Sequence, residues 1–420
     1  MDKISIIGGR TLKGTVQVSG SKNAILPLLF SSLLADGEHV FHNVPDLKDV
    51  ETSCLLLKHL GCELQRSGNT LKVKTNKLKS LKAPYQLVRQ MRAGILVLGP
   101  LLARYGRAEV SLPGGCAIGT RSVHLHLQGL RQMGAEMNLN KGLIVARVKK
   151  TLQGKRILLD YPTVGGTENI MMAACLAKGI TFIENAAREP EIIDLAEYLN
   201  KMGAKVKGAG TDLIQITPKR PLSPGEHTVI PDRIEAGTLL LAGAITKGHI
   251  SVSSCVPSHL EALLLKLEAA GFFINIKGPT IELSSPPHFS TVNIVTAPYP
   301  GFPTDLQAQF MALMTQAKTG GVSSLRETIF ENRFMHTQEL ARLGADVQLD
   351  GHTALVKGGT LLRGAPVTAT DLRASACLIL AGLRAQGETL VHRVYHLDRG
   401  YESLEKKLAS LGANIKRLKE

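Results

Sequence analysis

The strongest constraint on the fold of this 420-residue chain is an internal repeat. A phrase of the form Leu-x-x-x-Gly, usually followed by alanine, recurs six times at intervals of 68 to 73 residues. Its glycines are Gly61, Gly134, Gly203, Gly271, Gly344 and Gly412. Self-similarity at a fixed period indicates one supersecondary unit used repeatedly. The chain is therefore predicted to consist of six copies of one unit.

The content of each unit follows from the segments around this phrase. A second apolar helix pattern precedes each copy and ends near a glycine, which is the usual stop for a helix; these glycines are Gly37, Gly106, Gly179, Gly248, Gly320 and Gly387. Turn signals follow the second helix, as SGN at Ser67, NKG at Asn140 and DG at Asp350. Each unit is predicted to run helix, strand, helix and then two strands joined by a turn.

The ends of the chain and a proline cluster indicate two domains. The sixth unit ends one strand short after ANIKRL, and the N-terminal KISIIGG would supply that strand. Four prolines (Pro218, Pro221, Pro224 and Pro231) mark a crossover at the midpoint. We therefore predict one domain over residues 22–230 and a second formed by 1–21 and 231–420, each of three units. Segments such as AGTLLLAGAI are apolar nearly all round, so the helices should be buried inside the sheets.

The composition indicates which kinds of binding partner and which cellular compartment to expect. The net charge is +15, but the basic residues are dispersed, aromatic residues make up 4 % and there is no tryptophan. This pattern argues against a nucleic-acid partner and suits small anionic substrates. No window of 18 apolar residues predicts membrane insertion, and the N-terminus lacks a secretory pattern. Six scattered cysteines without a C-x-x-C pair predict neither zinc nor disulfides and suit a cytoplasmic location.

The segment LPGGCAIGTR carries the clearest chemical signal. Cys116 lies among three glycines, five residues before Arg121, and a cysteine near a fixed cation is biased towards the reactive thiolate. In five units the closing glycines of the two helices are 23 to 25 residues apart, whereas in the second unit they are 28 apart. Insertions within a repeat tend to map to the binding face. We favour a functional thiol over an incidental loop cysteine.

Polar residues precede the helices at corresponding places. Those before the first helix of the units are Lys22, Asn23, Arg89, Arg92, Thr163, Gly165, Asp232, Arg233, Thr304, Asp305, Asp371 and Arg373; those before the second are Arg121, Arg188, Arg333 and Arg399. Helix N-termini and arginines together suit phosphates and carboxylates, and we expect these loops to converge on common rims.

Simpler explanations exist for most of these residues. Asn23, Thr304 with Asp305, and Asp371 are all good helix N-caps. The sequence neighbours Asp232–Arg233 and Asp371–Arg373 could form local ion pairs of little consequence. His124 and His126 have no clustered acids nearby, so they are interpreted as surface or packing histidines rather than metal ligands.

Eight segments in order make a resemblance specific: SGSKNAILPLL, PGGCAIGTR, ENAAREPEI, IPDRIEAGT, FPTDLQAQF, FENRFMHTQEL, TDLRASACL and HLDRGYE. Over essentially its whole length the chain resembles the enolpyruvyl transferases, and among them those that act on UDP-N-acetylglucosamine. The resemblance implies an α/β fold of two inside-out α/β barrels with six βαβαββ-type units, three per domain. It implies transfer of the enolpyruvyl group of phosphoenolpyruvate to the sugar 3-hydroxyl, the first committed step of peptidoglycan synthesis. It implies neither a cofactor nor a metal.

The resemblance also assigns roles to individual residues. Cys116, Asp305, Lys22 and Arg399 would be catalytic, with Cys116 as proton donor and target of fosfomycin and Asp305 as the base for the 3-hydroxyl. Phosphoenolpyruvate would contact Lys22, Asn23, Arg121 and Arg399. The sugar nucleotide would contact Asn23, Arg92, Arg121, Ser122, Val123, His124, Leu125, Thr163, Val164, Gly165, Asp305 and Ile329. Asp232, Arg233, Arg333, Asp371 and Arg373 would have supporting roles.

The chain departs from the family pattern in two places. Members commonly read RPVDLH after the cysteine segment, whereas this chain has RSVHLH, with Ser122 and His124, and Tyr161 stands where some members have lysine. Two alternatives stay open at this point: a 5-enolpyruvylshikimate-3-phosphate synthase, and a non-catalytic sugar-nucleotide-binding protein on the same fold. The sequence leaves the oligomeric state open.

Overall fold

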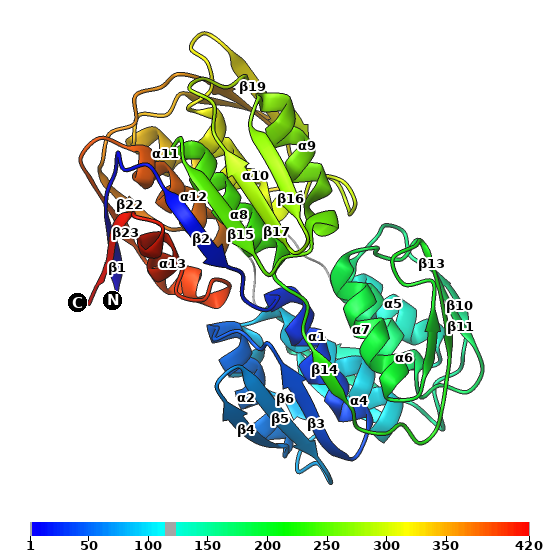
Figure 1. Ribbon diagram of the computed structural model, residues 1–420. Helices are drawn as coiled ribbons and strands as arrows, with labels where there is room; N and C mark the ends of the chain where they lie inside the picture. Colours follow the sequence, from blue (N-terminus) through cyan, green and yellow to red (C-terminus); the bar gives the residue numbers. More distant parts are fainter. Residues whose placement is uncertain (1, 114–122, 420) are drawn as a thin grey trace. The chain divides into compact units, whose positions relative to one another are not determined.

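The computed structural model describes residues 2–113 and 123–419. Contacts divide them into two compact units (Figure 1). The N-terminal unit comprises residues 20–113 and 123–230, and the C-terminal unit comprises residues 2–19 and 231–419. Each unit has its own core of buried apolar side chains.

Each unit contains three four-stranded sheets of one design. Those of the N-terminal unit are ordered β14(Glu226–Thr228)-β3(Gly37–His42)-β5(Thr70–Thr75)-β4(Glu63–Ser67), β6(Lys82–Ala83)-β7(Arg107–Ser111)-β9(Leu143–Arg147)-β8(Glu136–Asn140) and β10(Arg156–Leu158)-β11(Thr181–Glu184)-β13(Leu213–Thr217)-β12(Lys205–Lys207). Those of the C-terminal unit are ordered β22(Pro366–Thr368)-β23(Glu388–His392)-β1(Lys3–Ile7)-β24(Asn414–Leu418), β16(Phe273–Lys277)-β17(Thr280–Ser284)-β15(His249–Ser253)-β2(Lys13–Gln17) and β18(Ile294–Val295)-β19(Val322–Arg326)-β21(Thr353–Lys357)-β20(Val347–Asp350). In every sheet one edge strand is parallel to its neighbour and the remaining pairs are antiparallel.

The N-terminal strand completes the sixth unit, as the sequence predicts. Strand β1 lies between β23 and β24 and is antiparallel to both, with Ile4 opposite Val391 and Ile6 opposite Ile415. Its apolar side chains Ile4 and Ile6 are fully buried. The prediction that KISIIGG supplies the missing strand is therefore confirmed.

Two strands, β2 and β14, lie where the chain passes from one unit to the other. Strand β2 directly precedes helix α1 (Lys22–Ser31) of the N-terminal unit but pairs with β15 of the C-terminal unit. Strand β14 precedes helix α8 (Arg233–Ile245) of the C-terminal unit but pairs with β3 of the N-terminal unit. Each of these strands therefore stays in the unit that the chain is about to leave.

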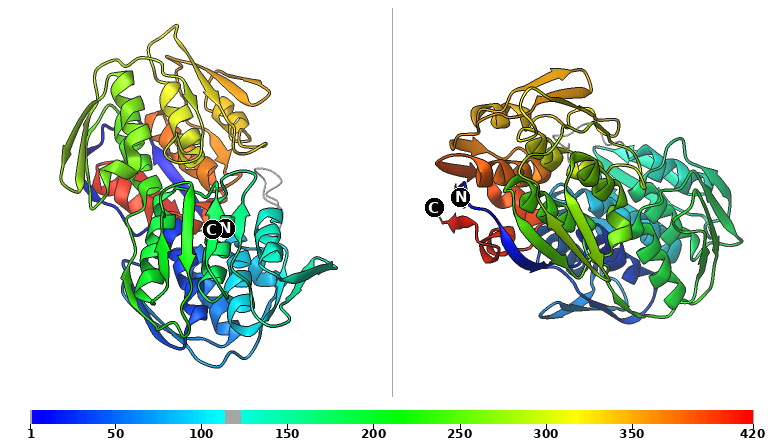
Figure 2. Two further views of the ribbon diagram at one scale, coloured as in Figure 1. Left: turned by 90° about the vertical axis from the view of Figure 1, so that its right-hand side faces the viewer. Right: turned by 45° about the horizontal axis from the view of Figure 1, so that its top comes forward.

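The first helix of each repeat is buried nearly all round. These helices are α1, α4 (Leu98–Tyr105) and α6 (Val164–Ala174) in the N-terminal unit, and α8, α10 (Thr304–Met314) and α12 (Leu372–Arg384) in the C-terminal unit. In α8 every residue from Ile234 to Ile245 is buried, and α8, α10 and α12 contact one another. Within each unit the sheets lie outside these helices (Figures 1 and 2). The apolar runs therefore form the interiors, as predicted.

The second helices bury one face each. They are α2 (Lys48–Leu60), α5 (His124–Gln132), α7 (Pro190–Lys201), α9 (Glu261–Ala270), α11 (Thr337–Arg342) and α13 (Leu404–Ser410). Short helical turns complete the chain: α3 (Tyr85–Val88), η1 (Ser32–Leu34), η2 (Arg92–Val97), η3 (Pro257–Leu260) and η4 (Val394–Arg399). Helix α2 ends at Gly61 with φ 113°, a conformation that glycine adopts without strain. Across the described residues, no helix combines the length and apolarity that a membrane span requires.

Candidate functional site

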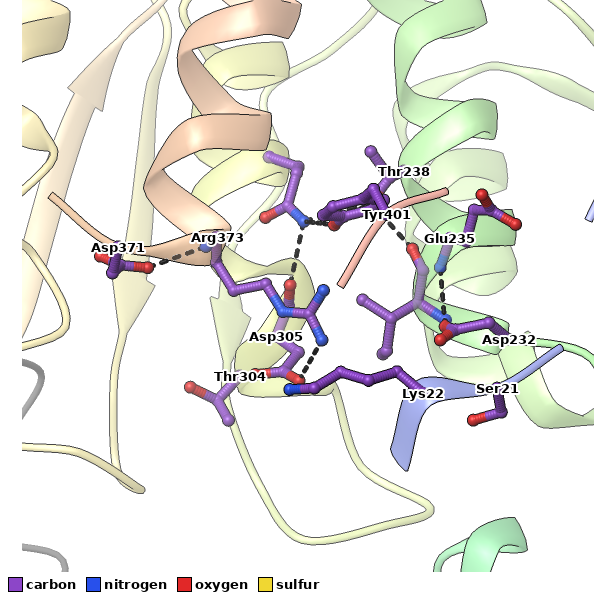
Figure 3. A network of polar contacts seen from close by, with 12 residues as sticks. Ser21, Lys22, Asp232, Glu235, Thr238, Thr304, Asp305, Asp371, Arg373 and Tyr401 are labelled. Atoms are coloured by element: carbon purple, nitrogen blue, oxygen red, sulfur yellow. Dashed lines mark hydrogen bonds and ion pairs between the residues drawn. The ribbon is translucent and has the colours of Figure 1, made fainter. Parts of the chain in front are cut away.

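Asp305 lies at the start of α10 and is held between two arginines. Its Oδ1 accepts a hydrogen bond from Arg333 Nη2 at 2.8 Å, and its Oδ2 accepts one from Arg373 Nη2 at 2.7 Å (Figure 3 shows the second). The two arginine side chains are 3 % and 5 % exposed, whereas that of Asp305 is 24 % exposed. Two cations at this distance favour the ionised carboxylate.

The expected capping role of Thr304 and Asp305 is wrong. The residue at the N-cap of α10 is Pro303, which makes no side-chain capping bond, and Thr304 is the first helical residue. The Thr304 hydroxyl donates to Glu327 Oε2 at 2.9 Å, and the Asp305 carboxylate is engaged by the arginines. Neither side chain caps α10, and the Asp305 carboxylate is instead held by side chains from other parts of the unit.

Asp371 caps the neighbouring helix α12. Its Oδ1 accepts from the backbone N–H groups of Arg373 at 2.8 Å and Ala374 at 3.1 Å, so the capping interpretation is confirmed for this residue. Among the described residues the Arg373 guanidinium forms its ion pair with Asp305, so the local Asp371–Arg373 pair is wrong. Burial lowers the pKa of Arg373, but the charge and hydrogen bond of Asp305, together with smaller effects of Tyr401 and Asp232, outweigh burial and raise the net pKa.

Asp232 caps α8 in the same way. Its Oδ1 accepts from the N–H groups of Ile234 at 2.8 Å and Glu235 at 2.9 Å. The guanidinium of Arg233 lies over the Tyr299 ring, 5.6 Å from its centre. Equivalent aspartates thus cap α8 and α12, whereas at the start of α10 the carboxylate of Asp305 is turned to the arginines.

A buried polar network supports Arg373. Its guanidinium lies 5.5 Å from the centre of the Tyr401 ring, and Tyr401 Oη is 2.9 Å from Thr238 Oγ1 (Figure 3). Gln309 Nε2 donates to both hydroxyls, at 3.1 Å and 3.2 Å. Because these side chains are buried, the network fixes the plane against which Arg373 packs.

Arg399, predicted to bind phosphoenolpyruvate, is half-buried at the end of η4. Gly400 follows it, and a Cβ there would come within 2.6 Å of the Leu372 side chain at the start of α12. Glycine therefore lets η4 pack closely on α12. This contact places Arg399 on the same unit as Asp305 and Arg373.

Glu327 was missed at the sequence level. This carboxylate is 1 % exposed; its Oε2 accepts from Thr304, and its Oε1 accepts from the N–H groups of Ile329 at 2.8 Å and Phe330 at 3.2 Å. It therefore ties the start of α10 to the backbone of Ile329, a predicted sugar-nucleotide contact. A lone glutamate after a strand gives no sequence signal for this role.

Lys22 begins α1 in the N-terminal unit. Its Nζ lies 3.3 Å from Asp49 Oδ2, and the two side chains are 15 % and 4 % exposed. Ser21 is the N-cap, and its Oγ accepts from Ala24 N at 3.3 Å, so the capping interpretation of Asn23 is wrong. Lys22 is therefore a partly exposed cation that is oriented by a buried carboxylate.

Thr163 caps α6 and brings the predicted diphosphate segment against α5. Its Oγ1 accepts from Gly166 N at 3.4 Å. A Cβ on Gly165 would lie 3.0 Å from the His126 ring. His126 is buried and its Nδ1 lies 3.1 Å from Asn169 Nδ2, which confirms its packing role. Burial, with help from the Arg92 and His124 charges, lowers the pKa of His126 to about 3.

The two departures from the family pattern are neighbours in space. The rings of His124, the first residue of α5, and Tyr161 lie 6.0 Å apart and tilted by 56°. Val123 and Leu125, on either side of His124, are buried, whereas Tyr161 is 49 % exposed. The two departures, although distant in the sequence, therefore bring two aromatic rings together into one partly exposed pair.

Several predicted residues take no described part in these clusters. Cys116, Arg121 and Ser122 lie outside the described residues. Arg188, one of the arginines before the second helices, pairs with Asp212 at 3.1 Å between exposed side chains. In the described ranges 2–113 and 123–419, no group of three or more His, Cys, Asp or Glu residues is arranged to hold a metal ion.

The fold defines the class of protein. NikO, an enolpyruvyl transferase from Streptomyces tendae, superposes with a TM-score of 0.89 at 24 % identity, over 99 % of this chain and 98 % of that one. EPSP synthase from Acinetobacter baumannii superposes with a TM-score of 0.76 at 17 % identity, over 100 % of both chains. The chain thus has the enolpyruvyl transferase fold, with six repeats in two units.

Residues 6–408 match the model of the EPSP synthase (3-phosphoshikimate 1-carboxyvinyltransferase) family, and the chain belongs to this family. Among curated relatives, it is similar to the UDP-N-acetylglucosamine 1-carboxyvinyltransferase of Bdellovibrio bacteriovorus, with 58 % identity over 98 % of this chain and 99 % of the relative. The enzymes of the same name from Geotalea uraniireducens and Myxococcus xanthus are 57 % and 55 % identical over 100 % of both chains.

Proposed function

We propose that this protein is a transferase that moves the enolpyruvyl group of phosphoenolpyruvate to the 3-hydroxyl of UDP-N-acetylglucosamine and releases phosphate. The chain is 54 to 58 % identical over its full length to relatives named UDP-N-acetylglucosamine 1-carboxyvinyltransferase, and this identity supports the proposal. The product would enter peptidoglycan synthesis, and we place the reaction in the cytoplasm, in keeping with six scattered cysteines.

The first chemical requirement is positive charge, because both substrates are polyanions. Arg399 of the C-terminal unit and Lys22 and Arg92 of the N-terminal unit supply it, and we assign the same role to Arg121, which lies outside the described residues. Guanidinium groups match phosphate and carboxylate oxygens in pairs, and N–H groups at helix starts add further donors. Lys22 is suited to this task because Asp49 orients its partly exposed ammonium group.

The second requirement is a proton acceptor, and the geometry of Asp305 is the single observation that carries the proposal. The carboxylate lies at the start of α10, partly exposed and kept ionised by two buried arginines. In the addition step, the 3-hydroxyl oxygen bonds to C2 of phosphoenolpyruvate and the hydroxyl gives its proton to Asp305. The Arg333 and Arg373 hydrogen bonds fix the direction from which the carboxylate takes that proton.

The third requirement is a proton for C3 of phosphoenolpyruvate. Cys116 gives its thiol proton to C3 as the C2–O bond forms, which yields a tetrahedral intermediate. In the second half the Cys116 thiolate takes a proton back from C3 and the enolpyruvyl double bond forms. The C2–O bond to phosphate breaks, and the proton that Asp305 accepted passes to the leaving phosphate, which returns both side chains to their starting states. Atoms and charge balance without a cofactor, and the products are the enolpyruvyl ether and inorganic phosphate.

One assay separates this proposal from both alternatives. The purified protein is mixed with phosphoenolpyruvate and either UDP-N-acetylglucosamine or shikimate 3-phosphate, and released phosphate is measured. We expect release with the sugar nucleotide alone. Release with shikimate 3-phosphate alone would identify the sister synthase, and no release with either, in protein that still binds the sugar nucleotide, would identify a non-catalytic binding protein.

A further inference from the structure

The N-terminal unit carries an open pocket at the C-terminal end of α4, apart from the residues assigned to the reaction. Its volume is ≈ 420 Å³, and its lining includes five cations, Arg104, Arg107, Arg147, Lys150 and Arg220, together with Tyr105. We propose that this pocket is a second anion site that binds a small organic phosphate.

The charges of the pocket are only partly balanced. Arg104 forms an ion pair with Asp36, and Arg147 forms one with Glu136 at 2.9 Å. In the part of the chain that the structure describes, no carboxylate pairs with Arg107, Lys150 or Arg220, and none lines the pocket. Three positive charges therefore face one open volume without a protein counter-charge.

Arg220 is built into the wall of the pocket. Its Nε donates to the carbonyl of Leu176 at 2.7 Å, and its Nη2 donates to that of Ala103 at 3.4 Å, near the end of α4. These bonds to neutral carbonyls fix the guanidinium but leave its charge unbalanced. A fixed cation that keeps its charge is what an anion site needs, since little side-chain freedom is lost on binding.

The register of the sheet places two arginines directly opposite each other. Arg107 begins β7 and Arg147 ends β9, and they are cross-strand partners. Like charges at opposed positions destabilise a sheet. Glu136 relieves Arg147, and no carboxylate relieves Arg107 among the described residues. A phosphate between the two guanidinium groups would remove this repulsion and accept paired hydrogen bonds.

The hydroxyl of Tyr105 gives a second, independent indication of a ligand in this pocket. Its hydroxyl is buried and has no hydrogen-bond partner among the described residues, although the residue lines the pocket. The Arg104 guanidinium lies 5.0 Å from the centre of its ring. Burial raises the pKa of Tyr105, so the group is a neutral hydroxyl that can donate or accept a hydrogen bond. Leaving such a group unsatisfied is costly, and a ligand oxygen would satisfy it once the ring turns its hydroxyl, which has almost no exposed surface here, towards the pocket.

Size and chemistry define the ligand class. Small-molecule sites span about 300 to 1,000 Å³, so the pocket exceeds what inorganic phosphate needs. Leu102 and Val148 add apolar wall between the cations. These features fit a phosphate joined to a neutral body, such as a sugar or a nucleoside. The pocket lies at the start of β7, whereas the chain towards Cys116 leaves from its other end, about 13 Å away by strand rise.

Calorimetric titration with glucose 6-phosphate, ADP and inorganic phosphate tests the site. The wild type should bind at least one organic phosphate more tightly than inorganic phosphate. The variant Arg107→Gln/Arg147→Gln should weaken that binding about tenfold or more, because it removes charge-assisted hydrogen bonds. Glutamine keeps most of the side-chain length, and the ligand-free variant should melt at the same temperature as the wild type or higher, since it loses the repulsive pair.

Four further variants make the result decisive. Lys205→Gln/Lys207→Gln removes two exposed cations from β12 of the same unit and should bind as the wild type does. Arg399→Ala tests whether the probe sits among the residues proposed for the reaction, and it should leave binding unchanged. Tyr105→Phe should weaken binding without lowering the melting temperature. Lys150→Gln, on an exposed side chain, repeats the test if the double variant folds poorly.

Four results would overturn the proposal: no binding of either organic phosphate by the wild type, full binding by the folded pocket variants, equal loss in the β12 control, or loss in Arg399→Ala. The last result would assign the anion to the proposed reaction site. A failed phosphate-release assay leaves these binding results unaffected, so the two proposals are judged separately.

Discussion

The Asp305 carboxylate and the Arg373 guanidinium are 2.7 Å apart, although 68 residues separate them in the chain. This separation equals one repeat. Asp305 is the second residue of α10 and Arg373 is the second residue of α12, so the two residues occupy corresponding places in successive units. Because α10 and α12 pack against each other, the repeat itself brings an acid from one copy to a base from the next.

Asp305→Asn keeps the shape of the side chain and removes its charge. We expect kcat for phosphate release to fall by about 10² to 10⁴, the usual range for loss of a general base. Binding of UDP-N-acetylglucosamine, measured by calorimetry, should change much less. A variant with undiminished turnover would remove Asp305 from the proton transfer.

Arg373→Gln leaves Asp305 with one arginine. Because Asp305 is partly exposed and keeps Arg333, we expect the loss of unfolding free energy to stay below the roughly 3 kcal/mol of a fully buried pair, and kcat should fall as the carboxylate loses its orientation. The acidic limb of the pH–rate profile should move to higher pH, because the carboxylate protonates more readily with one cation than with two. Arg326→Gln, an exposed position on β19, is the matched control and should change neither property. An unmoved acidic limb would contradict the pairing role.

Fosfomycin should add once, at Cys116. Burial raises the pKa of the other five thiols, to about 11 for Cys54 and about 12 for Cys175, with upward shifts for Cys62, Cys255 and Cys377. At pH 7.5 they are therefore protonated and poor nucleophiles. Intact-protein mass spectrometry should show one adduct in the wild type and none in Cys116→Ser. Labelling spread over several cysteines would contradict this expectation.

The paired rings of His124 and Tyr161 should contribute to nucleotide affinity. The double variant His124→Ala/Tyr161→Ala removes a partly exposed aromatic surface beside the predicted diphosphate segment. We expect KM for UDP-N-acetylglucosamine to rise about tenfold, as loss of a stacking contact does, while kcat and KM for phosphoenolpyruvate stay nearly constant. Leu139→Ala, on an exposed apolar side chain of β8, is the control. Equal KM values in the wild type and the double variant would assign the rings a packing role.

Glu235 should make stability depend on pH. Burial raises its pKa to about 7, against opposing effects of Lys407, whose Nζ donates to Oε1 at 2.7 Å, and of Ser19, whose N–H donates to Oε2 at 2.6 Å. A raised folded-state pKa gives a contribution that is complete below about pH 4.5 and is lost as pH rises through about 7.

Chemical denaturation of Glu235→Gln checks this sign. Relative to the variant, the wild type should lose a few kcal/mol of unfolding free energy between pH 5 and pH 8, in line with 1.36 kcal/mol per pKa unit. The exposed Glu268→Gln should follow the wild type at every pH. A constant difference between wild type and Glu235→Gln would show that Glu235 does not titrate in this range.

Patterns along the chain were enough to predict the repeats, the buried helices and the use of KISIIGG as the missing strand. These features depend on periodicity and on glycine stops, which act over a few residues and are visible in each copy. The capping of α12 by Asp371 was equally local. Asn23, Thr304 and Asp305 are residue types that also favour N-cap positions, yet Ser21 is the N-cap of α1 and Pro303 is the N-cap of α10.

Tertiary structure alone decided the partners of the charged groups. The sequence places Arg373 two residues from Asp371, but its guanidinium reaches Asp305 on α10, and Glu327 joins Thr304 to the backbone of Ile329. Local preferences fix where a helix begins, since they act through the backbone of neighbouring residues. Which distant side chain a buried charge meets depends on how the packed helices are aligned, because a desolvated charge is stable only beside the opposite charge that packing brings to it.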